Sequence, residues 1–260
     1  MLEAGSHARG TAALRVVAGL ALLVSLVPNF GIVDLVTAIA PSGEWVPLRM
    51  LEVGWAIVFG VLFPVGFAAQ LRRGGGPVAS LQQLVVLTAS LALATLLTTK
   101  PHEWLLVAFW AAVTAVVVAL HPARSRVFAL GRPTDRRLAA LAAAALVPAG
   151  VYAAQMAAHY RAGLAGDDTN GFEHWTVQSA AAIAIVLLVA LSAIRTDGWR
   201  IPAISAAVSA ALLGALAIVS DGGPADFSAG WGVAVLAWSA LVLLATAWTG
   251  SARRRRGRAP

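Results

Sequence analysis

The chain has 260 residues, of which 59% are hydrophobic and 12% are charged, and its formal net charge is +7. Soluble domains usually carry about 25% charged residues, so this composition excludes an ordinary soluble fold. The chain contains no cysteine, which excludes thiolate metal ligands, iron–sulfur clusters and disulfides. The composition therefore points to an integral membrane protein.

Long apolar stretches recur along the chain between short polar loops, which is typical of an all-α, polytopic integral membrane protein. At about 20 residues for each crossing, the sequence predicts about eight transmembrane helices. They cover residues 12–28, 47–70, 78–98, 102–121, 137–159, 172–194, 200–219 and 229–249. Pro28 and Asn29 interrupt the first helix, and its continuation to Ala40 is interpreted either as a kinked extension or as a short helix in the membrane interface.

These boundaries divide the chain into an N-terminal segment (1–11), a single transmembrane domain (12–249) and a basic tail (250–260). Most arginines fall on one side of an eight-span arrangement. By the positive-inside rule, we expect both termini in the cytoplasm and the protein in the plasma membrane. The expected partners are the lipid bilayer and, for the tail, anionic headgroups; nucleic acid is not expected. The headgroup-binding residues of the tail are Arg253, Arg254, Arg255 and Arg256.

An acidic residue and a tryptophan recur where even-numbered helices begin. The examples are Glu44-Trp45, His102-Glu103-Trp104 and Glu173-His174-Trp175. This recurrence is consistent with a repeated helical hairpin and a duplicated ligand site. The alternative is that the tryptophans belong to the interfacial belt and the acids stabilise helix N-termini. Asn170 to Glu173 has the form of a capping box.

The fifth and sixth helices carry polar side chains near the outer surface. Tyr152, Gln155 and His159 share one helix face, and His174 and Gln178 share another. We therefore predict a small polar pocket that opens to the outside. Its candidate residues are His159, His174, Gln155, Gln178, Tyr152 and Glu173, with Asp167 and Asp168 around its mouth.

Paired histidines beside carboxylates suit a transition metal, a proton relay or haem iron. His159 and His174 are therefore the candidate metal ligands, although the sequence requires no cofactor. The alternative is that both histidines are partly hydrated residues at the membrane boundary, and that the polar side chains only bond across the helix pair.

Two further residues are secondary candidates. Glu52 lies inside the second helix, where an ionised carboxylate is costly enough to suggest a function; the alternative is an ion pair with Arg49. His102, at the start of the fourth helix, could belong either to the outer pocket or to the site of Glu52, depending on how the helices pack. Gln82 and Gln83 are expected in the headgroup region.

Small residues recur every four positions along the seventh helix, from Ala203 to Ala215. This spacing favours close helix contact, either within the bundle or with a membrane protein partner or a second copy of the chain.

Motifs for nucleotide binding, zinc proteases and serine hydrolases are missing from the sequence, so an enzyme is not the favoured interpretation. The favoured function is a small transporter or accessory permease subunit with an outward-facing polar pocket. The alternatives are a metal- or haem-binding membrane oxidoreductase or assembly factor, and a non-catalytic membrane scaffold.

Overall fold

The computed structural model describes the backbone of residues 2–72, 74–129, 134–220, 222–223 and 225–256, and the side chains within 11–248 apart from that of Glu44. Over these residues the fold is almost entirely helical, and eight helical segments are long and apolar enough to cross a membrane. The predicted all-helical architecture with eight spans is therefore confirmed at this level. The predicted headgroup residues Arg253–Arg256 lie outside the described side chains.

The eight segments are numbered here as spans 1 to 8. Their bounds are Thr11–Ile39, Arg49–Gln70, Val78–Thr98, Pro101–Leu120, Arg136–Arg161, His174–Ala193, Arg200–Ile218 and Ala229–Trp248. The underlying helices are α1 (Leu2–Leu26), α2 (Gly31–Ile39), α3 (Arg49–Trp55), the π-helix η2 (Ala56–Leu62), α4 (Phe63–Gln70), α5 (Val78–Thr98), α6 (Trp104–Leu120), α7 (Arg136–Arg161), α8 (His174–Ala193), α9 (Arg200–Ile218) and α10 (Ala229–Arg256). Short 3₁₀ turns are η1 (Gly43–Trp45), η3 (Pro101–Glu103) and η4 (Arg124–Arg126), and two short strands, β1 (Asp168–Thr169) and β2 (Phe172–Glu173), form an antiparallel hairpin.

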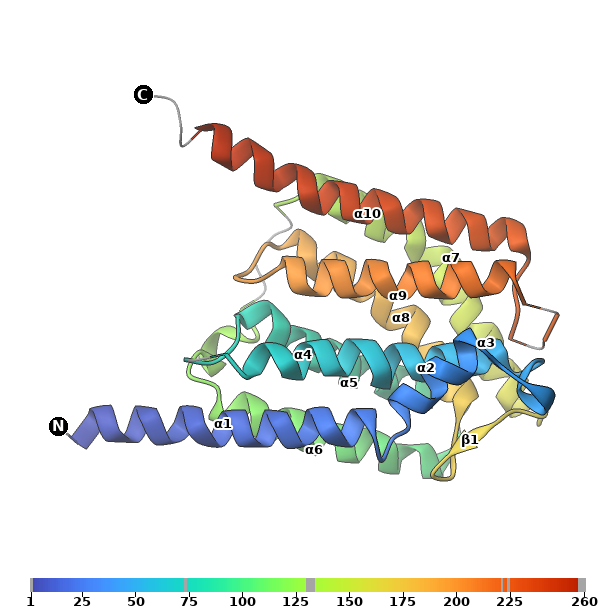
Figure 1. The fold of residues 1–260 in the computed structure, drawn as a ribbon, viewed down its shortest axis with the longest axis horizontal. Coiled ribbons are helices and arrows are strands. Elements are labelled where there is room, and N and C mark those ends of the chain that lie inside the picture. Colours follow the sequence, from blue (N-terminus) through green and yellow to red (C-terminus); the bar gives the residue numbers. More distant parts are fainter. Residues whose placement is uncertain (1, 73, 130–133, 221, 224, 257–260) are drawn as a thin grey trace.

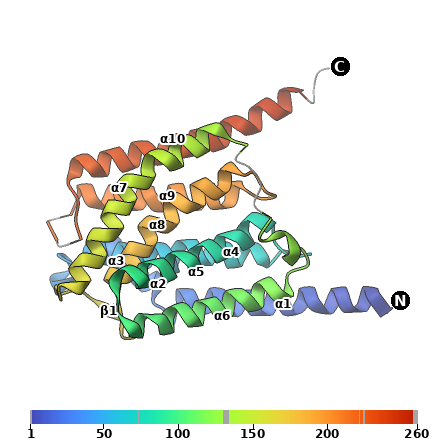
Figure 2. The same cartoon turned by 180° about the vertical axis from the view of Figure 1, so that it is seen from behind.

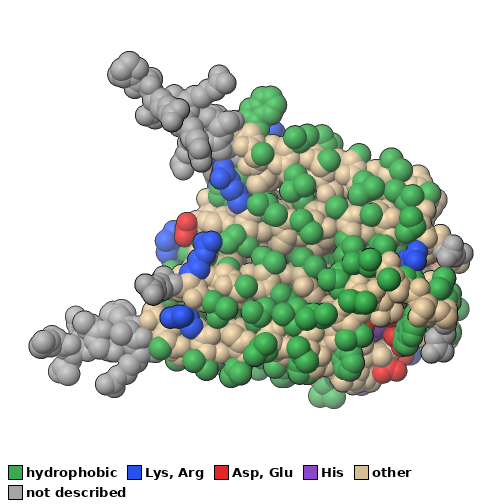
Figure 3. Space-filling view, in the orientation of Figure 1, with side chains coloured by type: hydrophobic (Ala, Val, Ile, Leu, Met, Phe, Trp, Pro, Cys, Tyr) green, Lys and Arg blue, Asp and Glu red, His purple; other side chains and the backbone are tan. Residues whose placement is uncertain are grey.

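The helices lie side by side in one bundle, and α1 begins at the same end of the bundle at which α10 finishes (Figures 1 and 2). We call this the termini end, and the opposite end, which carries the β1–β2 hairpin, the hairpin end. Figure 3 shows Lys and Arg side chains mainly at the termini end, where an acidic side chain also shows, and acidic and histidine side chains at the hairpin end. This distribution follows the charge asymmetry of the sequence.

Large apolar side chains cover the sides of the bundle between these ends (Figure 3). Leu105, Val147 and Leu244 are each more than 60% exposed. Extended apolar surfaces of this kind are rare on soluble monomers, and they suit contact with lipid.

Spans 2 and 6 form the centre of the bundle. In these two spans 83% of the residues in the most apolar stretch are buried, against 56% and 61% in spans 3 and 7 and 17% to 33% in the other four. Helix α8 packs against α3, α5, α7 and α9. Polar residues on α3 and α8 are consequently enclosed by protein rather than by lipid.

Span 1 is broken where the sequence predicted an interruption. Helix α1 ends at Leu26, and Phe30 adopts a left-handed conformation with φ of 56° before α2 begins. Helix α2 then turns onto α3 and η2, where Gly31 lies against the backbone of Phe59. Helix α2 is thus a short helix that buries one face, with Gly31, Asp34 and Ala38, against the bundle and leaves its other face exposed.

The π-helix η2 lies in the middle of span 2, and two side chains from other helices bond its carbonyl groups. Ser25 Oγ donates to the Phe59 carbonyl at 2.6 Å, and Gln83 Nε2 donates to the Leu62 carbonyl at 2.7 Å. Gln82 donates to the Val127 carbonyl. Both side chains are buried in the protein, where they satisfy backbone carbonyl groups.

At the termini end, Asp135 joins the start of α7 to the end of α8. Its carboxylate accepts the backbone N–H groups of Arg137 and Leu138 as an N-cap, and it pairs with Arg195. Burial raises the pKa of Asp135, but the hydrogen bond from Arg195, the backbone donors and the Arg195 charge outweigh burial and hold the pKa below its ordinary value of 3.8. The ionised carboxylate therefore stabilises this corner of the fold.

The small residues of α9 are used inside the bundle, because Ala203, Ala206, Ala207 and Ala210 are buried. Helix α9 meets α10 most closely at Gly214, where an added Cβ would lie 2.7 Å from the Gly232 carbonyl oxygen. Of the two alternatives for this stripe, the structure supports packing within one chain.

We expect Asp135→Asn to weaken the protein at pH 7 by about 1 kcal/mol, because the variant retains a cap acceptor and loses the ion pair. A carboxylate with a lowered pKa stabilises the fold above its unfolded pKa and loses this effect as the pH falls through the folded pKa. The difference between parent and variant should thus disappear on acidification below 3.8, the ordinary pKa. Thermal unfolding of both proteins in detergent at several pH values measures this difference in stability. An equal difference at every pH would contradict the ion-pair explanation.

We expect Gly214→Ala to destabilise the protein by about 1–3 kcal/mol, because the added methyl group forces α9 and α10 apart. The matched control is Gly150→Ala on α7, where an added Cβ meets no heavy atom within 4 Å. The control should unfold at the parent temperature or slightly above it, since alanine favours a helix. Equal unfolding temperatures for the two variants would show that the α9–α10 contact is loose.

Candidate functional site

The β1–β2 hairpin carries the chain from α7 into α8 at the hairpin end. Asn170 and Gly171 form its turn with positive φ angles of 57° and 80°, as a two-residue hairpin turn requires. Asn170 donates to the Pro28 carbonyl, and Glu173 precedes α8 without a side-chain cap bond. The expectation of a capping box from Asn170 to Glu173 is therefore wrong, because this segment is a hairpin.

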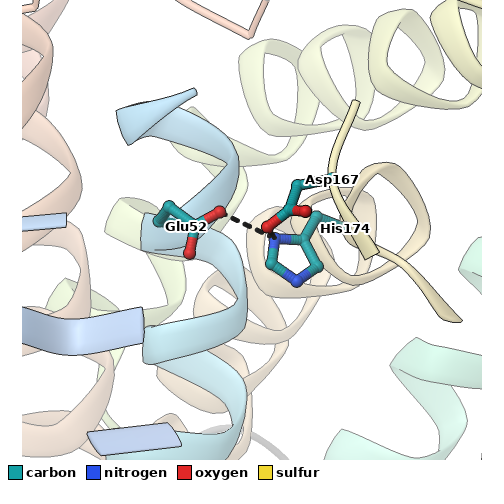
Figure 4. A group of neighbouring side chains, drawn as sticks. All are labelled: Glu52, Asp167 and His174. Atoms are coloured by element: carbon teal, nitrogen blue, oxygen red, sulfur yellow. Dashed lines mark ion pairs between the residues drawn. The ribbon is translucent and has the colours of Figure 1, made fainter. Parts of the chain in front are cut away.

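The hairpin places His174 and Asp167 beside Glu52 of α3, and the three side chains converge in Figure 4. His174 Nδ1 lies 3.2 Å from Glu52 Oε1 and 3.8 Å from Asp167 Oδ2. One ligand-type atom from each residue lies within 4.8 Å of the others. Glu52 and His174 are fully buried, whereas the Asp167 side chain is 22% exposed and reaches the surface.

A third acid joins this group as its fourth member. The Asp34 carboxyl of α2 is buried next to that of Glu52, and its charge acts on His174. We refer to Asp34, Glu52, Asp167 and His174 as the acid–histidine cluster. Arg49 does not pair with Glu52 as the sequence suggested; its guanidinium donates to the Val219 carbonyl at 2.7 Å.

His174 is held on two further sides. Its Nε2 lies 2.9 Å from Thr169 Oγ1 on β1, and its ring stacks on Trp55 with a centroid separation of 4.6 Å. A histidine that ligates a cation usually bonds its other ring nitrogen to a neighbour, which fixes the ring orientation. Thr169 supplies such a bond, and Nδ1 is left to face the carboxyl groups.

The centre of the cluster lacks hydrogen-bond donors. His174 Nδ1, Glu52 Oε1 and Asp34 Oδ2 are buried, and none of them makes a hydrogen bond of good geometry within the described part of the chain. Gln178 Oε1, one helical turn into α8, is also buried and has no hydrogen-bond partner among the described residues. Buried polar atoms are nearly always paired, so such a concentration indicates a ligand.

Trp55 also begins a column of aromatic rings along span 2. Phe59, Phe63 and Phe67 follow at intervals of four residues, with centroid separations of 4.8, 5.8 and 5.7 Å along the column. Trp110 of α6 packs against these three phenylalanines. The column seals the cluster from the middle of the bundle, because all five rings are fully buried.

The structure brings together only part of the predicted pocket. Gln178 Nε2 donates to Tyr152 Oη at 2.6 Å, and Tyr152 donates in turn to the Ala225 carbonyl. Gln155 is exposed on the outer side of α7, so the expectation that it lies with Gln178 is wrong. His159 packs edge-on against the Trp175 ring and is not part of the metal-type group around His174.

His102 and Glu173 belong to a second polar group, which we call the relay group because of its chain of hydrogen bonds. It consists of His102, Glu103, Tyr160 and the backbone of Glu173. Glu103 is fully buried, and its Oε1 accepts from Tyr160 Oη and from the Glu173 N–H, each at 3.1 Å. Burial and the charges of Asp168 and Glu103 raise the pKa of the Glu173 carboxyl.

The sequence indicated His174 and Glu52 separately and placed Asp167 at a pocket mouth and Glu103 in the recurring acid–tryptophan pattern, but it gave no role to Asp34 or Thr169. The one available signal was that these residues all fall near helix ends on the same side of the eight-span arrangement. That signal also includes acids outside both groups, such as Asp226, which bonds Ser220 and the Gly223 N–H.

We expect Tyr152→Phe to destabilise the protein by about 1–3 kcal/mol, because Gln178 Nε2 and the Ala225 carbonyl lose their partner in a buried position. Gln155→Ala, three residues along the same helix, is the control and should change stability by no more than about 0.5 kcal/mol. Thermal unfolding in one detergent compares them. A large loss in the control would show that Gln155 has a buried partner.

Comparison with known proteins provides no family for the chain: no protein-family model, no curated protein and no solved structure matches it. The function is accordingly argued from the geometry of the two polar groups.

Proposed function

We propose that this protein is a small integral membrane carrier for a divalent cation, which binds at Glu52, Asp167 and His174. The observation that carries the proposal is the convergence of three ligand-type atoms from separate segments within 4.8 Å. Two of these atoms are buried without a hydrogen bond of good geometry in the described residues. A cation would satisfy both atoms at once.

The donor set favours a transition metal ion of intermediate softness. One imidazole nitrogen suits Zn²⁺, Fe²⁺ or Ni²⁺, and carboxylate oxygens suit Mn²⁺ as well. Asp34 adds a further carboxyl group beside Glu52, which offers the ion another oxygen ligand. Thr169 on Nε2 keeps Nδ1 directed towards the ion.

Broken helices support a carrier rather than a purely structural metal site. Asp34 lies on the short helix after the break in span 1, and Glu52 lies just before the π-helix of span 2. Carriers commonly build their sites on discontinuous helices. The partial exposure of Asp167 provides access from the hairpin end.

The burial pattern supports a duplicated architecture. Spans 1 to 4 are 22%, 83%, 56% and 33% buried, and spans 5 to 8 follow the same order at 17%, 83%, 61% and 28%. We infer two four-span halves, of which spans 2 and 6 are the equivalent central members. The cluster lies between these two spans, and ligand sites between repeats are typical of transporters.

The proposed setting is the plasma membrane, with the arginine-rich termini end in the cytoplasm and the acid–histidine cluster facing outward. The proposed contacts of the tail are anionic headgroups, through Arg253–Arg256.

A metal-dependent membrane oxidoreductase is the second candidate. The aromatic column that starts on His174 favours it, because Trp55 and Trp110 are connected through Phe59 at ring separations of 4.8 and 5.5 Å. Haem is less well supported, since ligation through His174 Nε2 would displace Thr169.

The test is elemental analysis, an absorption spectrum and Zn²⁺ and Mn²⁺ titration of the detergent-purified protein. We expect one ion per chain, and we expect His174→Gln and Glu52→Gln to weaken binding by about 10–100-fold or more. His159→Gln is the matched control and should bind as the parent does. Equal loss in His159→Gln would move the site to the His159–His174 pair, and a haem band would favour the oxidoreductase.

Transport is then tested in liposomes that contain a metal-sensitive dye. We expect Zn²⁺ or Mn²⁺ flux in the parent and in His159→Gln, and none above that of empty liposomes in Glu52→Gln. Stoichiometric binding without flux would leave a metal site and overturn the carrier assignment.

A further inference from the structure

The relay group links the surface at the hairpin end to a buried carboxyl group. The His102 side chain is 49% exposed, and its Nε2 lies 3.1 Å from Tyr160 Oη and 3.3 Å from Glu103 Oε1. Glu103 itself is 0% exposed. Tyr160, at the end of α7, lies between the imidazole and the carboxyl group. A titratable surface group is thus in hydrogen-bond contact with an enclosed one.

Glu103 has one oxygen that the fold does not use. Its Oε1 accepts two hydrogen bonds, whereas its Oε2 is buried and has no hydrogen-bond partner within the described ranges. A carboxyl group held only for structure would normally bond both oxygens in such a place. No donor in the described part of the chain therefore holds Oε2, and the proton of Tyr160 reaches the carboxyl group at Oε1, which the Tyr160 hydroxyl already bonds.

We propose that His102, Tyr160 and Glu103 form a proton relay that exchanges a proton between the outer solution and Glu103, and that this proton moves opposite to the cation carried by the acid–histidine cluster. The second part rests on the proposed carrier function. Neither His102 nor Glu103 belongs to the proposed cation ligands.

The transfer conserves every proton and needs no electron. A proton from water binds His102 Nδ1, and the Nε2 proton passes to Tyr160 Oη. The hydroxyl proton of Tyr160 passes to Glu103. The result is a neutral imidazole, an intact tyrosine and a protonated Glu103; the reverse sequence unloads it. Relays of this kind suit a histidine at the water-exposed end.

Charges on several elements face the relay. Lys100 lies over the Tyr160 ring at 4.9 Å, Glu173 of β2 acts on Glu103 through its charge, and Arg161 of α7 donates to the Leu97 carbonyl nearby. These neighbouring charges act on Glu103 when it is ionised and have little effect on it when it is protonated.

One hydrogen bond connects the relay to the cation site. The backbone N–H of Glu173 donates to Glu103 Oε1, and the next residue in the chain is His174. Protonation of Glu103 weakens its attraction for this N–H, because a neutral carboxyl is a poorer acceptor than a carboxylate. The first turn of α8, which positions His174, thereby responds to the proton on Glu103.

The experiment uses the full chain in liposomes with a pH dye and a metal dye inside. We expect Zn²⁺ or Mn²⁺ influx to be accompanied by proton efflux in the parent. Glu103→Gln, which retains an acceptor for Tyr160 and Glu173, should bind metal as the parent does and lose proton efflux by at least about tenfold. Tyr160→Phe should slow proton efflux, and Asp197→Asn, which changes an exposed carboxylate between α8 and α9, should behave as the parent.

Proton efflux in Glu103→Gln at the parental rate would overturn the relay while leaving the carrier in place. If the parent moves no metal, the carrier function fails, and infrared difference spectra after a pH jump decide the relay alone. A protonated-carboxyl band that is present in the parent, missing in Glu103→Gln and slower to appear in Tyr160→Phe supports it. Identical bands in all three proteins would overturn it.

Discussion

Helices α3 and α8 cross so closely at Gly54 that an added Cβ would lie 1.8 Å from Gln178 Oε1. The positions of the other spans depend on this contact between the two most buried spans. It places Glu52 opposite His174, and it encloses both in protein. A larger residue at position 54 would separate the helices and admit lipid or water to the cluster. The other spans surround this pair and supply the remaining polar contacts.

Hydrogen bonds to buried backbone groups stabilise the helices around that crossing. In an apolar medium each backbone group needs a partner from the protein, and the π-helix of span 2 obtains two from Ser25 and Gln83. Several other buried polar atoms in the described bundle also lack a partner, among them Thr95 Oγ1, Thr176 Oγ1 and Ser209 Oγ. The unpaired atoms of Glu52 and His174 differ from these because they converge with Asp167 within 4.8 Å. This convergence is the physical basis for assigning a ligand to the cluster.

The two polar groups share the hairpin end but differ in their access to water. The acid–histidine cluster reaches solution through Asp167, and the relay group reaches it through His102. The chain from Asp167 to Glu173 contributes to both groups, since it carries Asp167 and Thr169 on one side and the Glu173 N–H on the other. The proposed exchange of a cation and a proton relies on such a shared element, because a change in one group must alter the other.

The sequence by itself predicted the all-helical architecture and the eight apolar helices, because hydrophobic length is a local property of the chain. The bounds of the last seven agree with the structure within two residues, whereas the first apolar segment continues to Ile39. It also selected His174 and Glu52 as unusual. Tertiary structure decided their partners: Asp34, Glu52 and His174 are far apart in the chain, and only the turn of α2 onto α3 and the crossing at Gly54 bring them together. Helical spacing placed Gln155 and His159 on one face with Tyr152, but it could not state which part of that face meets α8. The Asn170–Gly171 hairpin turn is a local feature, but its bond to the Pro28 carbonyl, across 142 positions, is a contact that no local pattern contains.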